Sequence, residues 1–87
     1  MEERDVYEFL HWCEWVEVVD ACEEAAKRTN TELEGFREGT YSTFAVFKYK
    51  DRRLKVSIDD LFELEYEEKV RKLVEEIKWH VENEVFC

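Results

Sequence analysis

Apolar residues recur with helical spacing in the first third of the chain. Residues 2–28 contain neither Pro nor Gly, and their apolar side chains fall into two rows on different sides of a helix. Polar residues recur every three positions through residues 8–20, so the solvent-facing strip is narrow and rotates around the helix. Such a helix needs more than one neighbour to cover it. One row is Trp12, Trp15, Val19, Cys22 and Ala26, and the other is Val6, Phe9, Leu10, Cys13 and Val16.

The centre of the chain alternates in the manner of β-strands. Residues 41–49 alternate between two sides, and residues 54–58 do so again after a polar turn at residues 50–53. We predict a β-hairpin there, with a short additional strand at residues 33–37 ahead of a turn at residues 38–40. A two-stranded sheet is marginally stable alone, so this sheet must pack on the helices.

Residues 59–86 predict a second helix. A capping box from Ser57 to Asp60 is expected at its start, and a kink can occur near Leu64. Its apolar stripe consists of Phe62, Tyr66, Val70, Leu73, Ile77 and Val81.

Acid–base pairs four positions apart are expected to support both helices. In the first helix the pairs are Glu23 with Lys27 and Glu24 with Arg28, close to an expected stop at Asn30. In the second helix they are Glu65 with Lys69, Glu67 with Arg71, and Glu68 with Lys72.

The predicted order is α-β-β-α or α-β-β-β-α. This is an α+β fold in which two long helices pack on a small antiparallel hairpin or three-stranded sheet. The 87 residues support one hydrophobic core, so residues 1–87 are taken as a single domain. The longer order is that of double-stranded-RNA-binding domains, which present lysines at the start of their second helix. This chain instead has Asp59, Asp60, Glu63 and Glu65 there, so the sequence does not support that family.

Composition excludes several classes of partner. The chain is 45% hydrophobic and 15% aromatic, which is too apolar for a disordered chain. Asp and Glu number 23 against 13 Lys and Arg, so the net charge is −10, and direct nucleic-acid binding or an anionic membrane is not expected. No stretch has the roughly 20 apolar residues of a membrane span, and the acidic N-terminus differs from a signal peptide. We expect a cytoplasmic protein, in the host cytoplasm if it is viral.

The sequence predicts no enzyme, cofactor or metal site. His11 and Cys13 are two positions apart, so on a helix they point in different directions, and His80 has only the terminal Cys87 as a potential partner. Paired Cys or His spacings typical of metal sites are missing from the sequence. Cys13 and Cys22 are expected to be buried small apolar residues.

Charge is unevenly distributed along the chain. Residues 1–26 hold nine acids and one base, whereas residues 27–56 hold four acids and eight bases. In the first helix, Glu14, Glu17 and Asp20 have no base three or four positions away. The basic hairpin at residues 48–55 can pair with the acidic helices or serve as a second protein contact. The chain also has more aromatic residues than so small an interior needs, which favours an aromatic contact with a partner.

We therefore expect a partner-binding face made of Trp12, Glu14, Trp15, Glu17 and Asp20. Carboxylates pair with Arg and Lys much as phosphates do. In charge and size the chain is similar to viral nucleic-acid mimics, including anti-CRISPR proteins, and to antitoxins or immunity proteins that cap a basic nuclease. That similarity implies an inhibitor of a basic, nucleic-acid-handling protein. The alternative is a homodimeric structural or adaptor module, in which the apolar faces meet and the acidity serves solubility.

Overall fold

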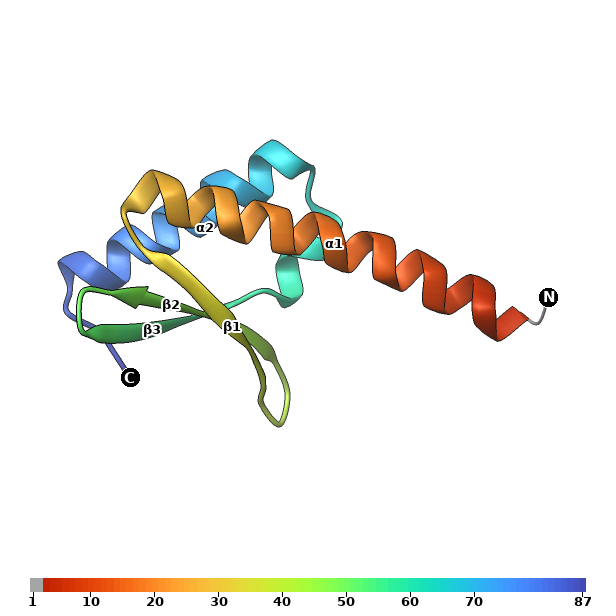
Figure 1. Cartoon of the computed structure of the whole chain (residues 1–87), viewed down its shortest axis with the longest axis horizontal. Helices are drawn as coiled ribbons and strands as arrows, with labels where there is room; N and C mark the ends of the chain where they lie inside the picture. The colour runs from red at the N-terminus through yellow and green to blue at the C-terminus, as the bar shows by residue number, and fades with distance from the viewer. Residues whose placement is uncertain (1–2) are drawn as a thin grey trace.

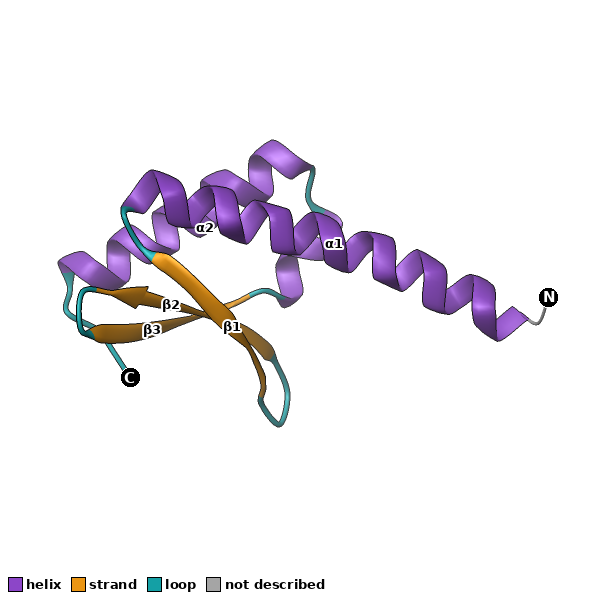
Figure 2. Cartoon of the chain, viewed as in Figure 1, coloured by secondary structure: helices purple, strands orange, loops and turns teal. Residues whose placement is uncertain are grey.

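Two helices cover one face of a three-stranded antiparallel sheet (Figures 1 and 2). The computed structural model describes the backbone of residues 3–87 and the side chains of residues 15–87. The observed order confirms the predicted α+β fold in its α-β-β-β-α form. The elements are α1 (Glu3–Thr29), β1 (Glu32–Glu38), β2 (Thr43–Tyr49), β3 (Arg52–Ser57), the 3-10 helix η1 (Asp59–Glu63) and α2 (Tyr66–Glu82).

The first helix ends where the sequence predicts. Asn30 adopts a left-handed conformation with φ of 56°, which Asn tolerates better than most residues. The Thr29 hydroxyl donates to the Ala25 carbonyl at 2.8 Å, and the Thr31 N–H donates to the Ala26 carbonyl at 3.0 Å. These bonds satisfy carbonyls that the helix end would otherwise leave open.

The sheet has the order β1-β2-β3, so β2 is the central strand. The hairpin predicted from β2 and β3 is present, and the predicted additional strand is β1. The register shifts between Leu33 and Gly35, which marks a β-bulge. Because of this shift, Leu33 and Phe36 both pack against the core, although residues three apart in a regular strand face opposite sides.

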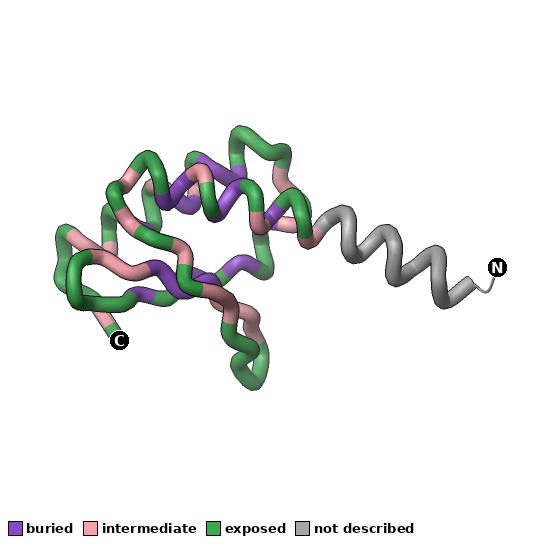
Figure 3. The backbone as a smooth tube through the Cα atoms, in the orientation of Figure 1, coloured by how far each residue is buried: buried purple, intermediate pink, exposed green. Residues whose placement is uncertain are grey.

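The core lies between the inner face of the sheet and the two helices (Figure 3). In the described part of α1, small residues dominate the buried face, which lets the helix approach its neighbours closely. Val18 is fully buried, although neither predicted stripe contained it, whereas Val16 is 39% exposed. The buried apolar residues of the core are Val18, Ala21, Cys22, Ala25, Ala26, Ala45, Phe47, Leu54, Val56, Ile58, Leu61, Val70, Leu73 and Ile77.

The predicted helix over residues 59–86 is wrong as one element. Residues 59–63 form η1, the chain is extended at Leu64 and Glu65, and α2 ends at Glu82. The predicted kink near Leu64 is therefore a complete break. No side chain caps η1, so the predicted capping box is also wrong. The Asp59 carboxylate instead accepts hydrogen bonds from the Thr43 N–H at 3.3 Å, which ties η1 to the sheet.

The C-terminal segment returns to the sheet after α2. The Cys87 N–H donates to the Arg53 carbonyl of β3 at 2.8 Å. Phe86 stacks on Tyr49 of β2, with ring centroids 6.4 Å apart. Residues 83–87 therefore cover one end of the hairpin instead of extending the helix.

Within the part of the chain that the structure describes, no helix combines the length and apolar character needed to cross a membrane.

We predict that Cys22 resists alkylation in the folded protein. Burial, and secondarily the charge of Glu23, raises the pKa of the Cys22 thiol from 9.0 to about 12, which lowers its thiolate fraction near neutral pH by roughly 1,000-fold. N-ethylmaleimide should label the exposed Cys87 first and Cys22 only after unfolding, as followed by peptide mass spectrometry. Equal labelling rates for these two cysteines in the native protein would show that Cys22 is not in the core.

Candidate functional site

A groove of about 460 Å³ lies between the end of α1 and the first half of α2. Four carboxylates line it against two guanidinium groups, so its charge is predominantly negative. One guanidinium, that of Arg28, lies 3.4 Å from Glu24 on its own helix, which confirms that predicted pair. The lining residues are Arg28, Glu65, Glu67, Glu68, Arg71, Val74 and Glu75.

Carboxylates of α1 lie close to the groove, as the surroundings of Tyr66 at the start of α2 show. Burial raises the pKa of Tyr66, and the charges of Glu24, Asp20 and Glu67 raise it further. Asp20 and Glu24 therefore lie close enough to act on the same region. We call this groove the acidic groove. Its lining carboxylates are Glu65, Glu67, Glu68 and Glu75, and Asp20 and Glu24 of α1 adjoin it.

The acids at the start of α2 also have a role in folding. Glu67 and Glu68 occupy the first turn, and Glu65 precedes it. Negative side chains are favoured there because they interact with the positive end of the helix dipole. The local sequence therefore places three carboxylates together at this helix end without requiring a basic partner for each of them.

The salt bridges predicted within α2 are wrong. Lys69 contacts Glu17 of α1 at 3.2 Å and Lys72 contacts Asp60 of η1 at 3.4 Å, so neither pairs with the acid four positions before it. Among residues 15–87, no salt bridge joins Glu65, Glu67 or Glu68 to a cation. These three acids were expected to be neutralised, and they are exposed with no salt bridge to any cation of residues 15–87.

Glu17 has no base three or four positions away in the sequence, but the fold brings a cation from α2 to it. Lys69 is only 3% exposed, and its ammonium group donates to Glu17 and to the Leu64 carbonyl. A buried charge is costly unless it is paired and hydrogen-bonded, and these two contacts meet that requirement. We call this arrangement the Glu17–Lys69 clamp. It was missed because it joins residues 52 positions apart, beyond any local spacing rule.

The remaining predicted site residues have different surroundings. Trp12 and Glu14 fall outside the residues whose side chains the structure describes. Trp15 packs within its own chain against Phe36 at 4.8 Å and Phe62 at 6.0 Å, measured between ring centroids. Of the described predicted residues, Asp20 adjoins the acidic groove, where its charge helps to raise the pKa of Tyr66, but it is not among the lining residues.

The cations of the hairpin do not pair with the acidic helices among the described residues. Arg53 forms a salt bridge with Glu34 in the neighbouring strand β1. Lys55 lies over the Phe44 ring, with its Nζ 5.4 Å from the ring centroid. Pairing with the helices was one of two roles expected of the hairpin, and among residues 15–87 Arg53 and Lys55 make contacts within the sheet instead.

Metal ligands do not gather anywhere in the described part of the chain, where no three His, Cys, Asp or Glu residues are placed to hold an ion.

No protein-family model matches the chain, and no curated protein or solved structure matches it either.

We predict that Tyr66 ionises above the usual tyrosine pKa of about 10. The folded state favours the neutral form of Tyr66. The stability that this form contributes is therefore complete below about pH 10 and is lost as the pH rises through the pKa of Tyr66 in the folded protein. The tyrosinate absorbance of the wild type minus that of Tyr66→Phe should give this titration. Replacing Glu24 with Gln should move it towards 10. A Tyr66 titration at or below 10 would contradict the placement of these charges.

Proposed function

We propose that the acidic groove docks on a basic protein surface and that the chain is a non-enzymatic binding module. One observation carries the proposal: Glu65, Glu67 and Glu68 stand together without a salt bridge among the described residues. Lys69 and Lys72, the predicted partners of Glu65 and Glu68, pair elsewhere. A surface of this kind is complementary to clustered Arg and Lys side chains.

The partner is a protein that handles nucleic acid, and docking inhibits it. A basic surface that binds phosphates accepts carboxylates with similar geometry. The net charge of −10 steers encounter with such a surface and opposes direct contact with nucleic acid. When the acidic groove covers the basic surface of the partner, the nucleic acid that this surface normally binds is excluded. Viral anti-defence proteins and antitoxins that cap a nuclease would act in this way.

Apolar groups at the groove add affinity that salt does not screen. Tyr66 is 37% exposed beside the carboxylates, and Val74 lines the groove directly. Tyrosine is frequent in interface hot spots because it buries a large area at low entropic cost. Trp12 and Glu14 stay predicted contributors on the preceding part of α1.

Self-association is the second candidate function. Trp79 of α2 is 52% exposed and contacts the ring of the adjacent His80 edge-on. Tryptophan is one of the residue types that are enriched in the hot spots of protein interfaces. In this alternative Trp79 lies in the interface of a homodimer, and the acidity serves solubility.

An arginine nonapeptide is a suitable probe of the acidic groove, with nuclear magnetic resonance of the full labelled chain as the measurement. We expect shift changes to concentrate at residues 20–28 and 65–75 and the affinity to fall as salt is added. Glu67→Lys combined with Glu68→Lys should weaken binding at least about tenfold, because like charges then face the peptide.

The matched control is Glu32→Lys combined with Glu38→Lys on β1, which changes the net charge equally and leaves the groove intact. It should retain most of the binding. Equal losses in the two double variants would mean that binding follows net charge, and the groove would not be the docking site. In capture from a host lysate, the control variant should retain the partner and the groove variant should lose it.

Sedimentation of the wild type tests whether the chain forms the homodimer of the second candidate function.

A further inference from the structure

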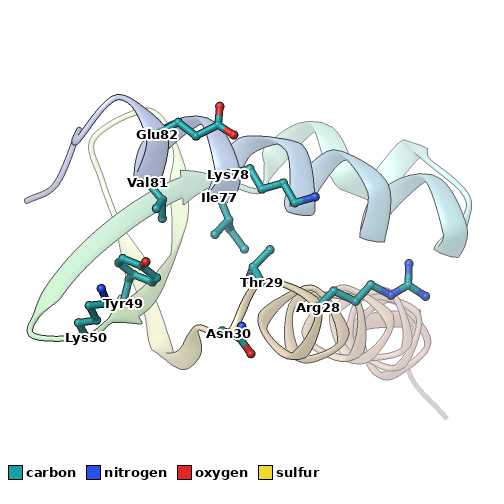
Figure 4. Close-up of a pocket in the computed structure, with 9 residues that line it drawn as sticks. All are labelled: Arg28, Thr29, Asn30, Tyr49, Lys50, Ile77, Lys78, Val81 and Glu82. Carbon is teal, nitrogen blue, oxygen red and sulfur yellow. The ribbon is translucent and has the colours of Figure 1, made fainter.

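A recess of about 490 Å³ lies on the helix side of the hairpin, between the end of α1, the turn that joins β2 to β3 and the second half of α2 (Figure 4). Lys50 and Lys78 stand on different sides of this recess, and Ile77 in its lining is fully buried. These groups do not converge on one ligand. The free edge of β3, by contrast, brings backbone groups and a cation together.

The backbone of β3 points away from the rest of the sheet at Lys55 and Ser57. β3 is an edge strand, because the sheet has the order β1-β2-β3. Ile58 donates its N–H to the Thr43 carbonyl at 3.0 Å, so this pair is hydrogen-bonded. Hydrogen-bonded and non-hydrogen-bonded pairs alternate along an antiparallel ladder. Ser57 and Lys55 belong to non-hydrogen-bonded pairs in this register, so their N–H and C=O groups face outwards.

The hydrogen bond made by Cys87 confirms this direction and shows that the edge accepts another segment. The Cys87 N–H donates to the Arg53 carbonyl at 2.8 Å, and Arg53 is the next outward-facing position of the same alternation. No other backbone hydrogen bond reaches the outward groups of Lys55 and Ser57 from the described residues. Both residues are exposed, so their N–H and C=O groups can bind an added strand.

A cation stands beside these groups on the face of the sheet away from the helices. Leu54 and Val56 point into the core, so Arg53 and Lys55 point to the opposite face. Arg53 already forms a salt bridge within the sheet. Lys55 forms none among residues 15–87, and its Nζ lies over the Phe44 ring. An acidic side chain on an added strand would therefore find its partner in Lys55.

The neighbouring position along the edge favours an uncharged residue. The Ser57 hydroxyl donates to the Asp59 carboxylate at 3.3 Å, so a negative charge already lies there. A recess of about 160 Å³ lies between this part of β3 and α2, and its charged lining residues are Asp60, Lys72 and Glu76. Lys72 is paired with Asp60. The edge therefore matches one acidic residue flanked by uncharged residues, and not a run of acids.

A second copy of this chain fits the edge less well than a different strand. Pairing of two β3 edges would bring Arg53 and Lys55 of both copies onto one face, where like charges oppose contact. The other edge strand, β1, has a bulge between Leu33 and Gly35, which interrupts regular backbone pairing. The occupant that the edge favours is therefore an extended segment of another molecule.

We propose that the free edge of β3 binds an extended peptide with a single acidic residue by adding it to the sheet as a fourth, antiparallel strand. A Glu of the peptide lies opposite Lys55. Its N–H donates to the Lys55 carbonyl, its carbonyl accepts from the Lys55 N–H, and its carboxylate pairs with the Lys55 ammonium group. Backbone hydrogen bonds supply affinity, and the ion pair selects the sequence. The site is separate from the acidic groove and does not depend on the proposed docking function.

Amide hydrogen exchange of the full chain alone is the first test. The amides of Lys55 and Ser57 face outwards and should exchange faster than those of Leu54 and Val56, which are bonded to β2. Equal or slower exchange at Lys55 and Ser57 would contradict the register and overturn the proposal.

The probe for binding is the acetylated and amidated pentapeptide Thr-Thr-Glu-Thr-Thr, in which Thr favours the extended conformation. In nuclear magnetic resonance of the labelled full chain, shift changes should concentrate at residues 53–57, and exchange at Lys55 and Ser57 should slow. The same peptide with an N-methyl group on its Glu keeps the charge but lacks the donor, and should bind at least about fivefold more weakly. Equal affinities would show that no strand is added, and absence of binding or shifts concentrated at the acidic groove would also overturn the proposal.

A matched pair of variants tests the ion pair. Lys55→Gln should weaken binding of the Glu peptide at least about threefold and leave unchanged the binding of a peptide with Gln in place of Glu. Lys78→Gln removes one charge from an exposed position of α2 and should bind the Glu peptide like the wild type. Equal losses in both variants, or no loss in Lys55→Gln, would overturn the proposal.

Discussion

The structure depends on how it accommodates one buried ammonium group. Lys69 lies within the contact between the helices, where an unpaired charge would cost several kcal/mol. Glu17 of α1 supplies the opposite charge and the Leu64 carbonyl supplies a hydrogen-bond acceptor. The ammonium group thus connects three segments: the middle of α1, the extended residues after η1, and the first turns of α2.

The acidic groove is a consequence of this accommodation. Lys69 and Lys72 are the residues that local spacing assigns to Glu65 and Glu68, and both are used in contacts between elements instead. The acids that remain lie at the start of α2, where the helix dipole favours them, and Asp20 and Glu24 approach from α1. The same fold therefore generates a predominantly negative surface between the end of α1 and the first half of α2.

Much of the fold could be predicted from local patterns. The alternation in β2 and β3 and the unbroken run of α1 each follow from periodicity, and the conformation at Asn30 follows from residue type. The break at Leu64 was harder, because residues 59–65 keep helix-compatible spacing while Asp59 binds the Thr43 N–H of the sheet. The candidate site was the least predictable part. From local spacing, the acids at the start of α2 are expected to pair with bases of the same helix, and Glu17 has no base nearby. In the structure Glu17 pairs with Lys69, and the α2 acids form no salt bridge among residues 15–87.

A double-mutant cycle on Glu17 and Lys69 tests this account most directly. The free energy of unfolding would be measured by denaturant titration for the wild type, Glu17→Gln, Lys69→Met and the double variant. We expect a coupling energy of about 1 to 3 kcal/mol. The double variant should recover much of the stability that Glu17→Gln loses, because no buried charge is left without its partner. Effects that add to within about 0.5 kcal/mol would show that the two residues act independently and would contradict the account.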